Sequence, residues 1–283
     1  MFRIDRPSDD DLALFHQNGY VAFPDVLTDA GREGLTNEIL STPEVVKFLQ
    51  MTDEERGQQR KPHRLNILAW NDKGPFAEQL FDAPLVTALL RAIIGETYHF
   101  SQSTVRISMP GAEGLEFHQD NHPIDLSEQN KWCVQMLYYP DGFERGDASL
   151  WVIPGSHRIT DWRKYAPYGP RIGEMTPELL TEIYGDQIGK EVVAEELALP
   201  PGSMVVMNAK MFHAVSPKAL DSPQPIRLFA NYVFKESNSP HNQTQSIPPE
   251  WIEKATPERR KLFEREASPL SPEDSRFLHS RYS

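Results

Sequence analysis

Cysteine is almost absent: Cys133 is the only one in 283 residues, which excludes an intrachain disulfide. A chain without disulfides suits a reducing compartment, so we expect a cytoplasmic location. Cys133 lies in an apolar stretch, and we interpret it as a small buried side chain rather than as a nucleophile.

Long hydrophobic runs and an excess of positive charge are missing as well. No run of about eighteen apolar residues occurs, which excludes a transmembrane helix, and the first residues have no apolar segment typical of a secretory signal. The formal net charge of −12 argues against a broad surface for nucleic acid or anionic lipid. We therefore expect neither nucleic acid nor a membrane as partner; no pattern indicates an oligomeric state.

Among the features that are present, apolar residues make up 39% of the chain, which suffices for a globular core. In the first third they recur at helical spacing behind capping residues such as Ser8 and Thr52. We predict helices over residues 11–18, 28–40, 44–49, 52–58, 76–81 and 84–94, and a strand over 20–23. Their expected role is a scaffold that packs against a sheet.

From residue 97 onward the apolar residues alternate with a period of two, and Gly and Pro punctuate the chain. We predict strands over 99–108, 115–120, 131–139, 148–153, 191–194, 203–207, 212–215 and 226–234, and helices at 176–184 and 257–266, with a polar insertion at 160–168. Short strands after a helical preface predict a mainly β fold with flanking α-helices, of the jelly-roll type.

A chain of this length is either one large domain or two small ones. We expect a single domain over residues 1–283. It would comprise a mostly helical scaffold (1–96), a jelly-roll core (97–235) and a C-terminal loop and helix (236–283).

The segment Phe117-His118-Gln119-Asp120 carries the first chemical signal. Successive side chains of a strand point to opposite faces, so we expect His118 and Asp120 on one face. An imidazole beside a carboxylate makes two thirds of the 2-His-1-carboxylate triad that holds non-heme Fe(II). Alone, the pair is explained more simply by a surface histidine beside a solvated aspartate, so the rest of the chain must decide.

Strands far apart in sequence converge in a jelly roll, and His213 on a predicted strand is the candidate for a third ligand. Arg227 opens the apolar strand that follows. An arginine there is either a rim charge or a planar fork that binds a carboxylate in bidentate fashion.

Together these segments resemble one family, the phytanoyl-CoA dioxygenase-like branch of the Fe(II)- and 2-oxoglutarate-dependent oxygenases. The similar pieces are Phe15 to Val21, Phe117 to Asp120, Leu150 to His157, His213 and Arg227. They occur in the family's order and span nearly the whole chain. The segment Pro154-Gly155-Ser156-His157 is hard to obtain by chance beside the others.

The resemblance implies a double-stranded β-helix, or cupin-like jelly roll, in which His118, Asp120 and His213 bind Fe(II). It implies that Arg227 pairs with the far carboxylate of the cosubstrate 2-oxoglutarate. Many relatives have Ser or Thr two residues after the distal histidine; Val215 stands there in this chain, which puts that contact in question.

The implied reaction consumes 2-oxoglutarate and O2, releases succinate and CO2, and oxidises an unactivated C–H bond of the substrate. In halogenating relatives a small residue replaces the carboxylate ligand. Asp120 therefore indicates hydroxylation, or a related desaturation or ring-forming oxidation.

Further residues are candidates for the same site. Gln102 and Arg106 lie on the strand before the metal strand, where relatives place cosubstrate or substrate contacts; polar groups on a strand face are the alternative. Gln135, which shares a strand face with Tyr139, is another candidate for cosubstrate binding. We expect Trp151 in the core, His157 in a structural role and His122 in a loop near the substrate.

Three alternatives stay open. The chain could be a jelly-roll metalloprotein that uses Zn(II) or Fe without an oxoacid, or a non-catalytic domain that has kept the fold. It could also hydroxylate an acyl-CoA, whose phosphates would suit the basic stretch Arg60 to Arg64. We favour a 2-oxoglutarate-dependent hydroxylase acting on a small free metabolite of a biosynthetic pathway.

Overall fold

The computed structural model describes residues 1–283 except for 71–73, 121–131, 160–176, 189–190, 237–248 and 264–283. The insertion expected at 160–168, the end of the helix expected at 257–266, and His122 lie outside the described residues.

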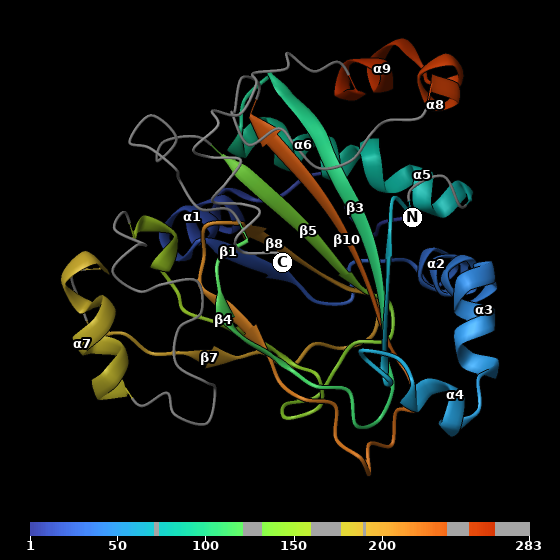
Figure 1. Cartoon of the computed structure of the whole chain (residues 1–283). Coiled ribbons are helices and arrows are strands. Elements are labelled where there is room, and N and C mark those ends of the chain that lie inside the picture. The colour runs from blue at the N-terminus through green and yellow to red at the C-terminus, as the bar shows by residue number, and fades with distance from the viewer. Residues whose placement is uncertain (71–73, 121–131, 160–176, 189–190, 237–248, 264–283) are drawn as a thin grey trace, which may run out of the picture.

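The described strands form two antiparallel sheets that face each other as the two layers of a jelly roll (Figure 1). The strands are β1 (Tyr20–Phe23), β2 (Arg64–Leu68), β3 (Tyr98–Ser108), β4 (Leu115–His118), β5 (Cys133–Tyr139), β6 (Leu150–Val152), β7 (Glu195–Glu196), β8 (Ser203–Asn208), β9 (His213–Val215) and β10 (Arg227–Glu236). The large sheet has the order β1-β8-β5-β10-β3-β2, and the small sheet has the order β4-β9-β6-β7.

Helices of the first third of the chain cover the outer face of the large sheet, as the sequence predicts, whereas α7 (Pro177–Ile188) packs against the small sheet (Figure 1). The helices are α1 (Asp9–Asn18), α2 (Asp29–Ser41), α3 (Pro43–Gln50), α4 (Asp53–Gly57), α5 (Pro75–Asp82), α6 (Pro84–Ile93), α7 (Pro177–Ile188), α8 (Pro249–Lys254) and α9 (Pro257–Phe263), with a 3-10 turn at Ser156–Arg158. The capping residues expected at Ser8 and Thr52 are confirmed, because both form capping boxes. No described helix is long and apolar enough to cross a membrane.

The alternation of side chains on each strand divides the large sheet into two faces. On β10, for example, Leu228, Ala230 and Tyr232 pack among the helices in the main core. Arg227 and Asn231 point the other way, toward the small sheet, and line a cavity between the two layers. Gln102, Thr104 and Arg106, which alternate along β3, line the same cavity.

Two strand predictions need correction. The strand expected over 115–120 ends at His118, so Asp120 follows the strand instead of lying on it. Residues 191–194 form no strand; Val192 instead packs in a cluster with α7 and donates its backbone N–H to Thr181 Oγ1 (3.3 Å). The short strand β7 comes directly after, where Glu196 pairs with Trp151 of β6.

Candidate metal centre and cosubstrate site

The two histidines of the predicted triad are brought together by strand pairing. His118 at the end of β4 lies directly opposite His213 at the start of β9. Their ring centroids are 4.3 Å apart. Residues 95 positions apart in the sequence thus share one corner of the small sheet.

Backbone carbonyl groups fix the orientation of both rings. His118 Nδ1 lies 2.7 Å from the carbonyl oxygen of Glu116, and His213 Nδ1 lies 3.0 Å from that of Met211. A carbonyl oxygen only accepts hydrogen bonds, so Nδ1 carries the proton in each neutral ring. The lone pair is then on Nε2, the atom that each histidine presents to a metal ion.

Asp120 completes the group from just beyond β4, where its backbone N–H donates to the Ala209 carbonyl (3.0 Å). Its Oδ1 lies 3.4 Å from His118 Nε2, and its Oδ2 lies 3.4 Å from His213 Nε2. Burial opposes ionisation, but the two histidines outweigh it and hold the pKa of Asp120 well below its usual range. The carboxylate is therefore ionised at neutral pH, as a metal ligand must be.

One ligand atom from each of His118, Asp120 and His213 lies within 4.8 Å of the others. Two imidazole nitrogens and one carboxylate oxygen on one side of a site are the donor set of non-heme Fe(II) centres. The sequence therefore predicted a group that the fold assembles, and its chemistry fits Fe(II).

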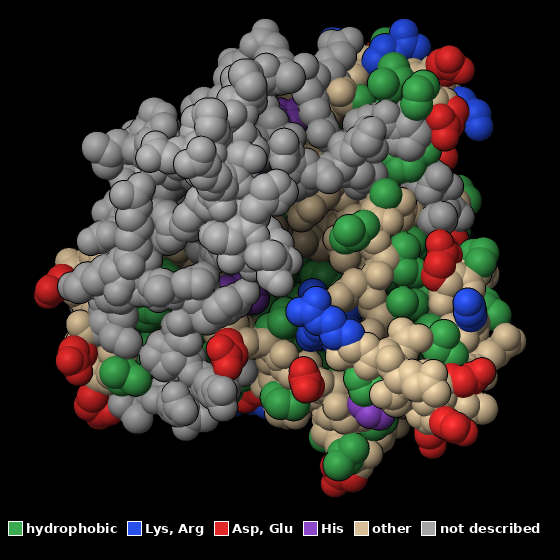
Figure 2. Space-filling model, in the orientation of Figure 1, with side chains coloured by type: hydrophobic (Ala, Val, Ile, Leu, Met, Phe, Trp, Pro, Cys, Tyr) green, Lys and Arg blue, Asp and Glu red, His purple; other side chains and the backbone are tan. Residues whose placement is uncertain are grey.

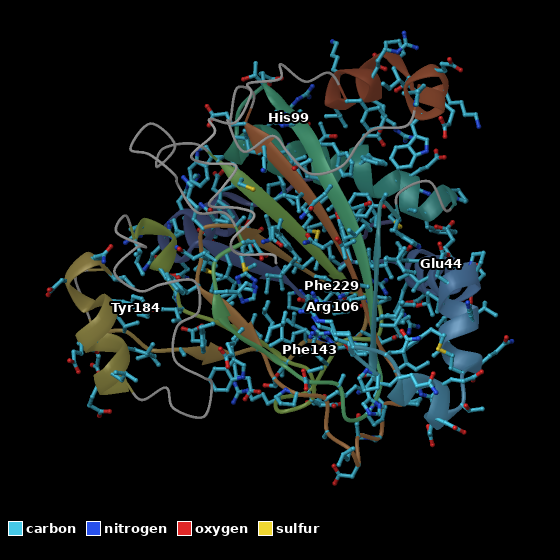
Figure 3. The ribbon with its side chains drawn as sticks, viewed as in Figure 1. Glu44, His99, Arg106, Phe143, Tyr184 and Phe229 are labelled. Carbon is cyan, nitrogen blue, oxygen red and sulfur yellow. The ribbon has the colours of Figure 1, made fainter. Side chains whose placement is uncertain are left out.

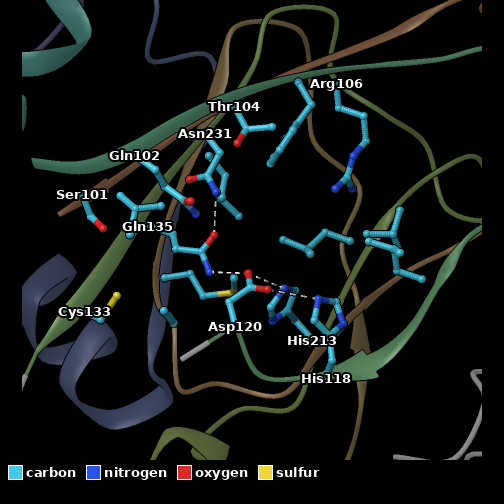
Figure 4. A pocket seen from close by; sticks show the side chains of 18 of the residues that line it. Ser101, Gln102, Thr104, Arg106, His118, Asp120, Cys133, Gln135, His213 and Asn231 are labelled. Carbon is cyan, nitrogen blue, oxygen red and sulfur yellow. Dashed lines mark hydrogen bonds and ion pairs between the residues drawn. The ribbon is translucent and has the colours of Figure 1, made fainter. Parts of the chain in front are cut away.

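Two amide side chains of the large sheet hold the carboxylate (Figure 4). Gln135 on β5 donates from Nε2 to Asp120 Oδ2 (2.6 Å), and Asn231 on β10 donates from Nδ2 to Gln135 Oε1 (2.8 Å). An ionised carboxylate only accepts hydrogen bonds, so it sets the direction of both amides. Sequence reasoning placed Gln135 near the site but missed Asn231, although Asn231 alternates with Arg227 on β10.

Arg227 lies in the same cavity, deeper between the sheets. Its guanidinium carbon is 5.0 Å from the ring centres of both Tyr139 and Phe143 and 6.0 Å from that of Phe229. The residue is 2% exposed, and its Nε has no hydrogen-bond partner among the described residues. A buried guanidinium without a carboxylate fits a site that receives an anion.

The cavity between the sheets has a volume of about 240 Å³ and is lined by the triad and Arg227. Gln102 and Arg106, which Figure 4 labels, line it as well. Val215 also lines it, whereas Ser216 hydrogen-bonds to Ser149 and Trp151. The serine after Val215 is therefore engaged outside the cavity, at the far side of the small sheet.

The other residues that the sequence singled out lie outside the metal triad. Cys133 is buried, as expected, at the wall of the cavity, and Trp151 is partly buried against the cluster that includes α7. His157 packs against Gly19 at the end of α1, and its Nδ1 is buried without a partner among the described residues. Figure 3 shows Tyr184 of α7 well away from Arg106, Phe143 and Phe229, which lie between the sheets.

A sequence model of the family described as phytanoyl-CoA dioxygenase (PhyH) matches residues 15–219. The chain belongs to the phytanoyl-CoA dioxygenase family. It is therefore an enzyme, a dioxygenase with the cofactors of that family: Fe(II), 2-oxoglutarate and O2. The matched residues include the triad but end before Arg227.

Known members and solved structures agree with this placement of the dioxygenase. The curated relative "Dioxygenase af480" of Aspergillus fumigatus is 19% identical over 263 residues, which cover 90% of this chain and 76% of the relative. Among solved structures, the alpha-ketoglutarate-dependent carbocyclase SnoK from nogalamycin biosynthesis is similar with a TM-score of 0.59 at 14% identity, covering 82% of this chain and 85% of SnoK. HygX from Streptomyces hygroscopicus, with nickel and 2-oxoglutarate bound, has a TM-score of 0.57 at 15% identity, covering 82% and 88%. At these identities the structures support the fold.

Proposed function

We propose that this dioxygenase hydroxylates, or otherwise oxidises, an unactivated C–H bond of a small-molecule metabolite, with release of succinate and CO2. The observation that carries the proposal is the pairing of two sites in one cavity. His118, Asp120 and His213 offer the Fe(II) donor set, and the buried Arg227 offers a fork for a carboxylate.

Each group of the chain has a defined task in this proposal. The two histidines and Asp120 hold Fe(II) on one side, which leaves positions for the keto acid end of 2-oxoglutarate and for O2. Arg227 binds the far carboxylate and so fixes the length of cosubstrate that fits. When bound, the iron and 2-oxoglutarate supply the oxidant for the C–H bond.

Gln102 and Gln135, which line the same cavity, are the other residues that we propose for cosubstrate binding. Arg106, for which the sequence leaves cosubstrate and substrate contact both open, lines the cavity as well. Gln135 donates a hydrogen bond to Asp120. It would therefore orient this metal ligand and affect the cosubstrate only indirectly. We also propose that residues 1–283 form one domain, because β1 and β2 from the helical region extend the large sheet.

The test is an anaerobic titration of the full chain with Fe(II) and then 2-oxoglutarate, followed by visible absorption. We expect a weak metal-to-ligand charge-transfer band that requires both, and that is lost in Asp120→Ala. Circular dichroism of the variant checks that it is folded. No band in folded, iron-loaded wild-type protein would reject the proposal in favour of a jelly-roll metalloprotein without an oxoacid.

A further inference from the structure

The cavity contains one arginine more than the proposed chemistry uses. Arg106 of β3 lies opposite Phe229 of β10, two residues along the strand from Arg227. Both arginines line the cavity and both contact the Phe229 ring, at 5.5 Å for Arg106 and 6.0 Å for Arg227. Figure 4 shows the Arg106 side chain reaching into the cavity from the strand above the metal ligands.

Arg106 is held in place from two sides. Its Nε donates to Asn66 Oδ1 of β2 (2.9 Å), and its guanidinium lies over the Phe229 ring. Asn66 is its only hydrogen-bond partner among the described residues, and it forms no ion pair with any of them. With Nε engaged, the two Nη groups make the edge that a carboxylate binds in bidentate fashion.

The charges of the proposed site balance without Arg106. Fe(II) and Arg227 together offset Asp120 and the two carboxylates of 2-oxoglutarate. Lys235, which also lines the cavity, has interactions of its own at the far end of β10. A partly buried arginine without an acid partner among the described residues is costly unless an anion arrives to pair with it.

More positive charge surrounds Arg106 on its outer side. Burial and the nearby cations Arg64 and Arg227 lower the pKa of Arg106 to about 10, so it stays protonated at neutral pH. Lys61 lies close enough that Arg64 and Arg106 also lower its pKa, after burial. Figure 2 shows basic side chains beside a hollow near the middle of this face, where Figure 3 labels Arg106. Such a rim attracts anions toward the cavity despite the negative net charge of the whole chain.

We propose that Arg106 recognises the substrate, and that the substrate is an organic acid whose carboxylate binds the Nη edge of Arg106. The inference rests on the proposed oxygenase function and narrows its substrate class. The acid would enter past Lys61 and Arg64, pair with Arg106, and extend its carbon skeleton toward the iron. Arg227 binds the cosubstrate, so the two arginines bind carboxylates of two different molecules in one cavity.

The experiment uses the full chain loaded with Fe(II) and 2-oxoglutarate without oxygen, and matched pairs of probes. 3-Phenylpropanoic acid is compared with 3-phenylpropanamide, octanoic acid with octanamide, and octanoyl-CoA serves as a third arm. A shift of the charge-transfer band reports binding, and succinate formation after admission of air reports stimulated turnover. We expect the acids to give both signals and the amides to give neither.

Three variants test whether binding of the acids depends on Arg106. Arg106→Gln should weaken binding of the acids by about 30-fold or more, because it removes a charged hydrogen-bond donor pair. Arg106→Lys keeps the charge but not the planar fork, so its affinity for the acids should lie between those of Arg106→Gln and wild type. Arg91→Gln, which removes an exposed cation of α6 that does not line the cavity, should leave binding of the acids unchanged.

The 2-oxoglutarate titration decides between the two arginines. The dissociation constant for 2-oxoglutarate should be unchanged in both Arg106 variants. A higher dissociation constant in either variant would overturn the proposal, because Arg106 would then bind the cosubstrate. Equal binding of acids and amides, a response to octanoyl-CoA alone, or no response to any acid would overturn it too. Absence of the charge-transfer band in wild type would instead reject the proposed function, so the two failures are distinguishable.

Discussion

At the scale of single residues, the proposed role of Arg227 in cosubstrate binding leads to a first prediction. Arg227→Met keeps an unbranched apolar stem in the cavity but removes the guanidinium that lies over Tyr139 and Phe143, and with it the charge. We expect the dissociation constant for 2-oxoglutarate to rise by about 100-fold, since a buried charged hydrogen-bond pair is lost, while Fe(II) affinity stays the same. Calorimetric titration of each ligand measures both; equal loss of both would contradict the assignment.

The amide pair beside Asp120 leads to a second prediction. Gln135→Leu removes the donor that holds Oδ2, so Asp120 has freedom to turn away from the histidines. We expect Fe(II) affinity to fall by roughly tenfold, the size typical for loss of a group that orients a metal ligand. Asn231→Leu should have a smaller effect, because Asn231 acts through Gln135.

Competition with a fluorescent metal chelator gives the two Fe(II) affinities. An unchanged affinity in Gln135→Leu would show that the carboxylate is held by the histidines and the backbone alone.

At the scale of elements, the joint between α1 and the 3-10 turn at Ser156–Arg158 is tightly packed. Gly19 caps α1 in the left-handed conformation (φ 85°), and a Cβ atom there would lie 2.4 Å from His157 Nδ1. Gly95 has a similar backbone (φ 103°) after α6 but has no atom within 4 Å of such a Cβ.

These two glycines make a matched pair. Gly95→Ala should cost about 1 kcal/mol of the free energy of unfolding, from backbone strain alone. Gly19→Ala should cost about 3 kcal/mol, because the clash with His157 adds to the same strain. Urea denaturation measures both; equal costs would mean that His157 moves aside freely.

The same joint predicts a dependence of stability on pH. Burial and the charge of Arg158 lower the pKa of His157 to about 4, below the roughly 6.5 expected for the unfolded chain. The unfolded chain then binds a proton more readily, so stability is lost as the pH falls from about 6.5 toward 4. Between pH 7 and pH 5 the loss from this group is about 2 kcal/mol.

Urea denaturation of wild type and His157→Gln at both pH values isolates this contribution. The variant should be less sensitive to the change in pH by that amount. An identical loss in the two proteins would assign the pH dependence to other groups.

Elements differ in how far the sequence predicts them. The helices of the first third follow from local spacing and caps, and they are confirmed. Strand β2 was not predicted, because Arg64–Leu68 is short and its partner β3 lies some forty residues further on. The metal triad followed from a family pattern, whereas the role of Asn231 depends on which way the Gln135 amide points, and only the three-dimensional arrangement fixes that direction.

At the scale of the whole molecule, the site joins the two sheets. The histidines belong to the small sheet, whereas Arg227, Gln135 and Asn231 belong to the large one. In the proposed site, a cosubstrate bound at both iron and Arg227 would therefore link the two sheets.

This arrangement predicts a stepwise gain in thermal stability. Fe(II) should raise the midpoint of unfolding, and 2-oxoglutarate should raise it further only when iron is present. At a concentration about 100 times the dissociation constant, a ligand adds about 2.7 kcal/mol. Anaerobic scanning calorimetry measures each step; Arg227→Met should lose the second step and keep the first.

The strand order of the large sheet has a consequence for synthesis of the chain. Tyr20 of β1 pairs with Met207 of β8. The strand that is synthesised first therefore cannot pair until a strand near the end of the jelly roll has been made. His213 and Arg227 emerge from the ribosome later still. Pairing between such distant segments is slow, and apolar strands stay exposed meanwhile. We therefore expect the large sheet to fold only after β8 has been made, with the iron site among the last parts to form.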